Sequence, residues 1–109
     1  MNKPLRISRQ FYRDIDVVLG YLGTVASSDV VRRFASAVES TRGHIKQFPA
    51  SGRLQDADDS NIKDLRMFPV SRYPDYLLFY IDGPVEVVLV RLLHGKRDIG
   101  VELEGIDID

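Results

Sequence analysis

The sequence has 109 residues, no cysteine and a formal net charge of −1 at pH 7. A chain of this length forms one domain that buries a core without cross-links, and the lack of cysteine excludes disulfides and thiolate metal sites. The near-neutral charge argues against a protein that mainly holds nucleic-acid phosphates, because their affinity comes largely from positive charge. No secretory signal pattern and no membrane-length apolar run is present, so we expect a cytoplasmic protein.

The first half of the chain predicts a short strand followed by two helices. Residues 5–8 alternate apolar and polar side chains, and Ser8 can cap a helix that runs to about Gly23. On that helix Asp14 and Asp16 should face water, while the apolar side chains fall on one helical face: Phe11, Ile15, Val18, Leu19 and Leu22. A second helix runs from residues 27–29 to Pro49, and the short link predicts an antiparallel hairpin.

Residues 50–61 are polar and rich in turn-forming residues, which predicts a surface loop. Asp56, Asp58 and Asp59 could suggest calcium, but their spacing lacks the closing Glu and central Gly of an EF-hand loop. We therefore expect a solvated loop, and no metal or cofactor anywhere in the chain.

The second half predicts three strands in succession, over residues 62–70, 76–81 and 85–93. The strand at 76–81 is apolar on both faces and should lie near the centre of a sheet. Residues 71–75 form the turn before it, Asp82-Gly83 forms the turn after it, and Pro84 suits the first residue of the next strand. We expect the wholly apolar set of Leu77, Phe79 and Ile81 to face the helices.

The order of elements predicts an α+β fold in one domain spanning residues 1–109. Its natural arrangement is a helical hairpin packed on one face of a small, mostly antiparallel sheet. Residues 99–109 follow as an acidic tail. In the last strand Arg91 should share a face with Val87 and Leu89, with its stem packed and its head in water.

Several segments resemble the ParE/RelE superfamily of toxins from toxin–antitoxin modules, and most closely its ParE branch. The matching features are Arg72, the "LLFY" strand, the strand 87–93 and the closing His94-Gly95-x-Arg97-Asp98, with "FPASGR" upstream. The resemblance covers nearly the whole chain in order. It implies a RelE/ParE-like sheet in which the first strand lies beside the last.

The resemblance to ParE implies a toxin that inhibits DNA gyrase by binding it and that is neutralised by a small, partly disordered ParD-type antitoxin. The expected target-binding residues are basic: Arg66, Arg72, Arg91, Lys96 and Arg97. In that case the protein has no active site of its own.

The RelE branch offers a second hypothesis, a ribosome-dependent endoribonuclease that cleaves messenger RNA. Its catalytic set would line the open face of the sheet and supply a base, an acid and cations: Arg72, Tyr80, Arg91, His94 and Arg97. The place of His94 at a strand end also favours a structural role, in which it hydrogen-bonds the backbone of the turn. A third hypothesis is a non-toxic binding module of the same fold.

Overall fold

A computed structural model describes residues 3–55 and 62–109 of the chain. Its elements, in chain order, are β1 (Leu5–Ile7), α1 (Arg9–Val25), α2 (Ser28–Gln47), the 3-10 turn η1 (Pro49–Ser51), β2 (Arg53–Leu54), β3 (Leu65–Val70), β4 (Tyr73–Asp82), β5 (Val87–His94) and α3 (Ile99–Glu102). The α+β class is confirmed, while the described residues add a strand and a short helix to the prediction.

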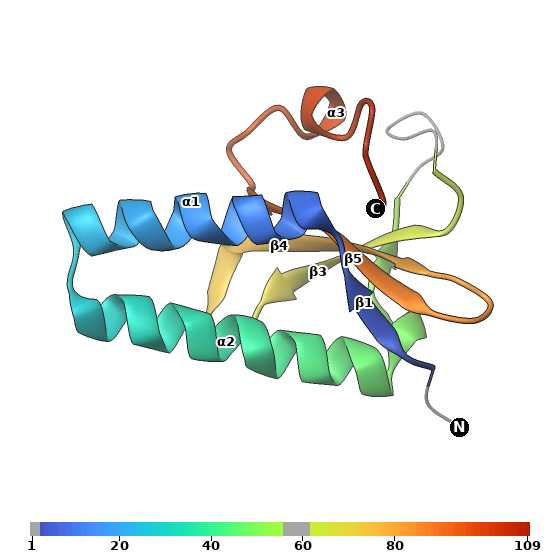
Figure 1. Ribbon diagram of the computed structural model, residues 1–109, viewed down its shortest axis with the longest axis horizontal. Coiled ribbons are helices and arrows are strands. Elements are labelled where there is room, and N and C mark those ends of the chain that lie inside the picture. Colours follow the sequence, from blue (N-terminus) through green and yellow to red (C-terminus); the bar gives the residue numbers. More distant parts are fainter. Residues whose placement is uncertain (1–2, 56–61) are drawn as a thin grey trace.

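The strands form one sheet in the order β1-β5-β4-β3-β2, with β4 at the centre as predicted. β1 runs parallel to β5, and the other neighbours are antiparallel. The α1–α2 hairpin lies along one face of this sheet, and α3 lies on the side of α1 away from α2 (Figure 1). The pairing of β1 with β5 confirms what the family resemblance implied.

Serine hydroxyls begin both long helices. Ser8 accepts a hydrogen bond from the Phe11 N–H at 3.1 Å, and Ser27 accepts one from the Val30 N–H at 3.3 Å. Each satisfies an amide at the helix N-terminus that has no partner within the helix. The two-residue link between α1 and α2 then turns the chain back on itself, which confirms the antiparallel hairpin.

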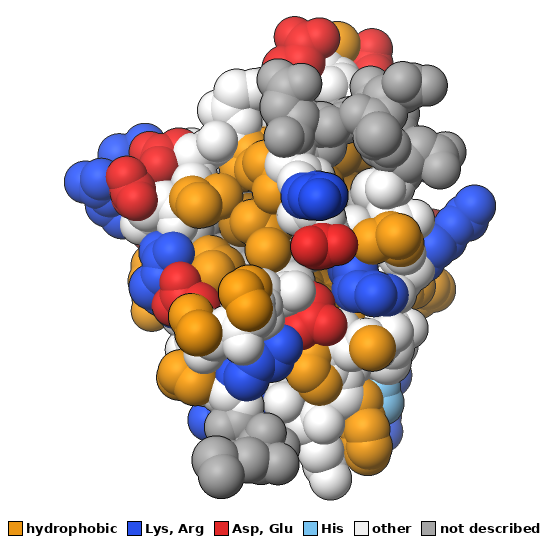
Figure 2. Space-filling view, turned by 90° about the vertical axis from the view of Figure 1, so that its right-hand side faces the viewer, with side chains coloured by type: hydrophobic (Ala, Val, Ile, Leu, Met, Phe, Trp, Pro, Cys, Tyr) orange, Lys and Arg blue, Asp and Glu red, His pale blue; other side chains and the backbone are white. Residues whose placement is uncertain are grey.

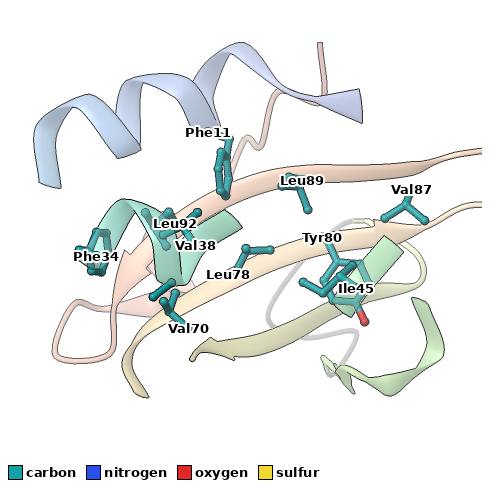
Figure 3. Close-up of a cluster of buried hydrophobic side chains, with 11 residues drawn as sticks. Phe11, Phe34, Val38, Ile45, Val70, Leu78, Tyr80, Val87, Leu89 and Leu92 are labelled. Atoms are coloured by element: carbon teal, nitrogen blue, oxygen red, sulfur yellow. The ribbon is translucent and has the colours of Figure 1, made fainter. Parts of the chain in front are cut away.

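The main core lies between the hairpin and the sheet (Figure 3). Phe11, Phe34 and Ile45 come down from the helices, while Leu78 and Leu89 rise from the sheet, and all five are at most 2% exposed. Each such side chain contributes about 1.5–3 kcal/mol through burial. This packing fixes the hairpin on the sheet.

The predicted orientation of the central strand is wrong. Tyr76, Leu78 and Tyr80 face the hairpin, whereas Phe79 belongs to a second apolar cluster that includes Leu65 and Leu103. The C-terminal segment covers that second face, so both faces of β4 are buried. An apolar run buried on both faces carries no signal for which side meets the helices.

A β-bulge breaks the predicted alternation along β5. Tyr80 pairs with Leu89 but Phe79 pairs with Arg91, which leaves Val90 between the two registers. An extra residue of this kind shifts every later side chain to the opposite face. Arg91 therefore does not share a face with Val87 and Leu89, and Leu92 takes the place toward the helices.

Three smaller predictions are also corrected. The predicted loop contains η1 and β2 in its described part, while Asp56, Asp58 and Asp59 lie outside the described residues. The turn before β4 ends sooner, because β4 begins at Tyr73. Pro84 lies in the turn after β4, where the Gly83 N–H bonds the Glu86 carbonyl at 3.0 Å and delays the start of β5 to Val87.

Candidate partner-binding site

Tyr80 and Arg66 hold the segment after α2 against the sheet. The Tyr80 hydroxyl donates to the Pro49 carbonyl at 2.6 Å and accepts from the Gly52 N–H at 2.8 Å. Arg66 donates to the Gly52 carbonyl at 2.8 Å. A Cβ atom at Gly52 would stand 2.4 Å from the Tyr80 oxygen, so only glycine fits here. The "FPASGR" motif therefore has a structural explanation.

The phenol of Tyr80 stays protonated in this setting. Burial raises its pKa, although the hydrogen bond from Gly52 and the charge of Arg66 act in the opposite direction. The side chain is fully buried. A proton donor enclosed in this way fixes the backbone at residues 49–52 and does not face solvent, where a substrate would bind.

Replacing Tyr80 by Phe is expected to lower the free energy of unfolding by about 1–3 kcal/mol, because the buried Gly52 amide loses its partner. Urea unfolding measures this loss. The matched control is Tyr12→Phe on the exposed face of α1, which should change stability by less than about 0.5 kcal/mol. Equal stabilities for the two variants would contradict the assigned role.

Arg91 is the centre of an ion-pair network that ties α1, β5 and α3 together. Its Nε lies 2.8 Å from Asp14 Oδ2, and its Nη2 lies 3.1 Å from Asp14 Oδ1, which makes a two-pronged pair. Nη1 donates to the Glu102 carbonyl at 2.9 Å, and Glu102 Oε1 accepts from Arg97 at 3.0 Å. Two predictions are wrong here: Asp14 does not face water, and the head of Arg91 is not solvated.

The carboxylate of Asp14 also closes an edge of the sheet. β1 ends opposite Leu89, so among the described residues the rest of β5 has no neighbouring strand on that side. Asp14 accepts the Leu92 N–H at 2.8 Å, and the Ser8 hydroxyl donates to the Val90 carbonyl at 3.2 Å. Side chains of α1 thus satisfy backbone groups that would otherwise be available to an added strand.

Hydrogen bonds and opposite charges favour the ionised forms of Arg91 and Glu102 and shift the pKa of each. Burial opposes the charge of Arg91, but the hydrogen bonds and charges of Asp14 and Glu102 outweigh it and raise the pKa of Arg91. For Glu102, the hydrogen bond with Arg97 is the main cause of a pKa below its ordinary value of 4.5. A carboxyl whose pKa is depressed by folding stabilises the fold above its unfolded-state pKa.

Replacing Glu102 by Gln is therefore expected to lower the Tm at neutral pH. The difference from the parent chain should shrink as the pH falls through the folded-state pKa of Glu102, because the parent then loses the same charge. Calorimetric scans between pH 7 and strongly acidic pH measure this. The exposed Glu104→Gln variant serves as control, and a pH-independent deficit in Glu102→Gln would contradict the ion-pair role.

The closing motif, residues 94–98, forms a turn at the end of β5. His94 Nδ1 accepts the Lys96 N–H at 3.1 Å, and the His94 ring meets the Tyr76 ring edge-on with centroids 4.9 Å apart. The expectation that His94 bonds the backbone of the turn is confirmed. Lys96 and Arg97 are exposed beyond it.

The residues proposed for RNA cleavage do not all meet at one site. Arg91, His94 and Arg97 line one groove beside α1. Tyr80 is enclosed between the sheet and the hairpin, and Arg91 is held by Asp14 and Glu102. Arg72 lies in the β3–β4 turn, while His94 and Arg97 lie at the end of β5. The face of the sheet that would bind RNA is occupied by Leu103 and its neighbours.

A groove runs between α1 and the adjacent ends of β4 and β5. It has a volume of about 380 Å³, and we call it the α1–β5 groove. Its lining residues are Gln10, Asp14, Val17, Val18, Tyr21, Tyr76, Arg91, Leu92, Leu93, His94 and Arg97. Val17 and Tyr21 are 64% and 59% exposed, which is high for apolar side chains on one helical stripe. The groove thus combines exposed apolar side chains with charged ones.

Sequence reasoning missed Val17 and Tyr21. Both lie outside the apolar stripe assigned to the core, and they are four residues apart, which places them side by side on a helix. A second apolar stripe on a helix that already has a core-facing one is the signal that could have revealed the groove.

The charges at the opposite end of the molecule do not form a single basic patch. Figure 2 shows that Lys and Arg side chains alternate with Asp and Glu side chains on that face, with hydrophobic side chains between them. Ion pairs such as Arg6–Glu86 at 3.3 Å connect the two signs. This face offers no continuous track for a nucleic-acid backbone.

Among residues 3–55 and 62–109, no group of three or more His, Cys, Asp or Glu side chains could hold a metal ion. Within the same residues, none of the helices is both long and apolar enough to span a membrane.

The structure defines a small α+β domain in which a helical hairpin lies along one face of a mostly antiparallel sheet. The family model for the ParE toxin of the type II toxin–antitoxin system parDE matches residues 5–99. The chain therefore belongs to the ParE toxin family.

Among solved structures, the chain is similar to a chain of the chromosomal ParDE toxin–antitoxin system from P. aeruginosa, with a TM-score of 0.69. The likeness covers 84% of this chain and 95% of that chain at 12% sequence identity, so it bears on the fold alone. No curated protein matches the chain.

Proposed function

We propose that this ParE-family toxin acts in the cytoplasm by binding DNA gyrase and has no catalytic centre of its own. The observation that carries the proposal is that the RNA-cleavage candidates are engaged within the fold: Tyr80 is enclosed, Arg91 is ion-paired, and His94 accepts a hydrogen bond from the turn. General acid–base catalysis needs groups that are free to reach one reacting phosphate. A protein-binding mode of action needs no such set.

The exposed basic residues are then binding residues. Lys96 and Arg97 lie beyond the end of β5, and Arg72 lies in the neighbouring β3–β4 turn. Arg66 and Arg91 bond the chain's own carbonyls and carboxylates, so we now give them positioning roles. This revises the predicted target-binding set to Arg72, Lys96 and Arg97.

The test compares two reactions with the purified toxin: supercoiling of plasmid DNA by gyrase, and cleavage of messenger RNA on translating ribosomes. We expect inhibition of gyrase with intact RNA. RNA cleavage with active gyrase would favour the RelE-like alternative. Absence of both effects, together with normal growth on expression, would indicate a non-toxic binding module.

We further propose that a ParD-type antitoxin neutralises the toxin by laying an amphipathic helix into the α1–β5 groove. The exposed stripe of Val17 and Tyr21 matches the apolar face of such a helix, and Arg97 at the rim can pair with acidic residues beside it. The edge of β5 next to the groove is already closed by Asp14, which favours a helix over an added strand.

A further inference from the structure

A second groove lies where the first half of α2 meets the β3–β4 turn. It has a volume of about 530 Å³ and no acidic side chain in its lining; we call it the arginine–serine groove. Its lining residues are Arg33, Ser36, Ala37, Ser40, Ser71, Arg72 and Tyr73. Two arginines, three serines and one tyrosine therefore line one hollow.

Neither arginine has a carboxylate partner within the part of the chain that the structure describes. Arg33 only donates to the Asp29 carbonyl at 3.4 Å, and Arg72 makes no ion pair. The other arginines of α2 are paired on the same helix, Arg32 with Asp29 and Arg42 with Glu39. The two groove arginines are thus available for an external anion.

The backbone at Arg72 is held in an unfavourable conformation. Its φ angle is +69°, a region that favours glycine or asparagine. The turn is fixed there because the Ser71 N–H donates to Thr41 Oγ1 at 2.9 Å, and Thr41 is 2% exposed. An arginine at a position where glycine would be more stable suggests that its charge has a use.

We propose that the arginine–serine groove binds an acidic segment of a protein partner, namely the antitoxin in its complex with this toxin. Guanidinium groups bind carboxylates through paired hydrogen bonds, and serine hydroxyls can donate to the remaining oxygens. A nucleic-acid backbone fits less well, because binding a row of phosphates needs more cations than the two arginines of this groove supply, whereas one carboxylate is matched by one guanidinium. This inference rests on the proposed function only for the identity of the partner as the antitoxin.

Fluorescein-labelled octaglutamate serves as the probe, and its binding to the purified toxin is measured by fluorescence anisotropy at low salt. Arg33→Ala and Arg72→Gly are each expected to weaken binding about tenfold, the effect of losing one charge-assisted contact. Arg13→Ala on α1 removes the same charge elsewhere and should leave the Kd within twofold. Arg72→Gly should also raise the Tm, since glycine relieves the backbone.

Octathymidylate, a single-stranded DNA of similar charge, is the competing probe and should bind at least tenfold more weakly. Tighter binding of the DNA would overturn the proposal in favour of a nucleic-acid groove. No binding of octaglutamate, or an equal loss in Arg13→Ala, would overturn it as well. A lower Tm in Arg72→Gly would overturn the assignment of Arg72. The Kd and the Tm are measured on the purified toxin without any toxicity assay. Their outcome is therefore independent of whether the toxin inhibits gyrase.

Discussion

Replacing Asp14 by Ala is expected to destabilise the folded chain by about 3–5 kcal/mol, because it leaves the Arg91 guanidinium enclosed without its main partner. The same change removes the acceptor of the Leu92 N–H. Since small domains are stable by only about 5–15 kcal/mol, this is a large share of the total. Urea unfolding followed by circular dichroism measures it.

Asp16→Ala is the matched control, because Asp16 lies two residues away on the exposed side of α1. It should change stability by less than about 0.5 kcal/mol. The double change Asp14→Leu with Arg91→Met should recover part of the loss, since apolar residues often replace a buried ion pair at little cost. Similar stabilities for Asp14→Ala and Asp16→Ala would contradict the network's role.

This network alters how toxicity experiments should be read. Loss of toxicity in an Arg91→Ala variant is the expected result of unfolding and says nothing about catalysis. The double variant Lys96→Ala with Arg97→Ala is the sharper probe, because both side chains are exposed. We expect it to fold and to lose gyrase inhibition, and full inhibition by a folded variant would contradict the proposed binding set.

Replacing Tyr21 by Asp is expected to weaken the complex with the antitoxin by about 30-fold or more, the effect typical of a central aromatic residue in an interface. Tyr21 lines the α1–β5 groove and is more than half exposed in the free toxin, so the folded chain should keep its Tm. The measurement is calorimetric titration with the protein that co-purifies with the toxin from its native host.

Tyr12→Asp is the control for this experiment. Tyr12 lies on the same helix with a similar exposure of 56%, but it does not line the groove. It should leave the affinity within about twofold. An equal loss for both variants would show that charge on α1, and not the groove, sets the affinity.

The elements that the sequence predicted well share a local origin. Ser8 and Ser27 precede helices with one clear apolar face, and the run from Tyr76 to Ile81 is too apolar for an edge strand. The fold class and the central position of β4 follow from such short-range patterns. The pairing of β1 with β5 came from the family resemblance.

The candidate site was harder to predict because it depends on register and on covering segments. The bulge at Val90 took Arg91 off the face that it was expected to share with Val87 and Leu89, and no residue type near it marks the bulge. The acidic tail was not assigned to the core, yet Leu103 is 1% exposed against the sheet. In both cases the burial of a residue depends on segments that are distant in sequence.

Composition and periodicity by themselves determined the α+β class, the helical hairpin and the central strand. Only the tertiary structure decided what the charged and hydroxyl side chains do. The sequence pattern predicts that Asp14 is a surface carboxylate. In the fold, Asp14 lies beside Arg91 and the edge of β5 and bonds to both. The reason is physical: helix and strand patterns arise between near neighbours, whereas the partner of a charge 77 residues away is set by how those elements pack.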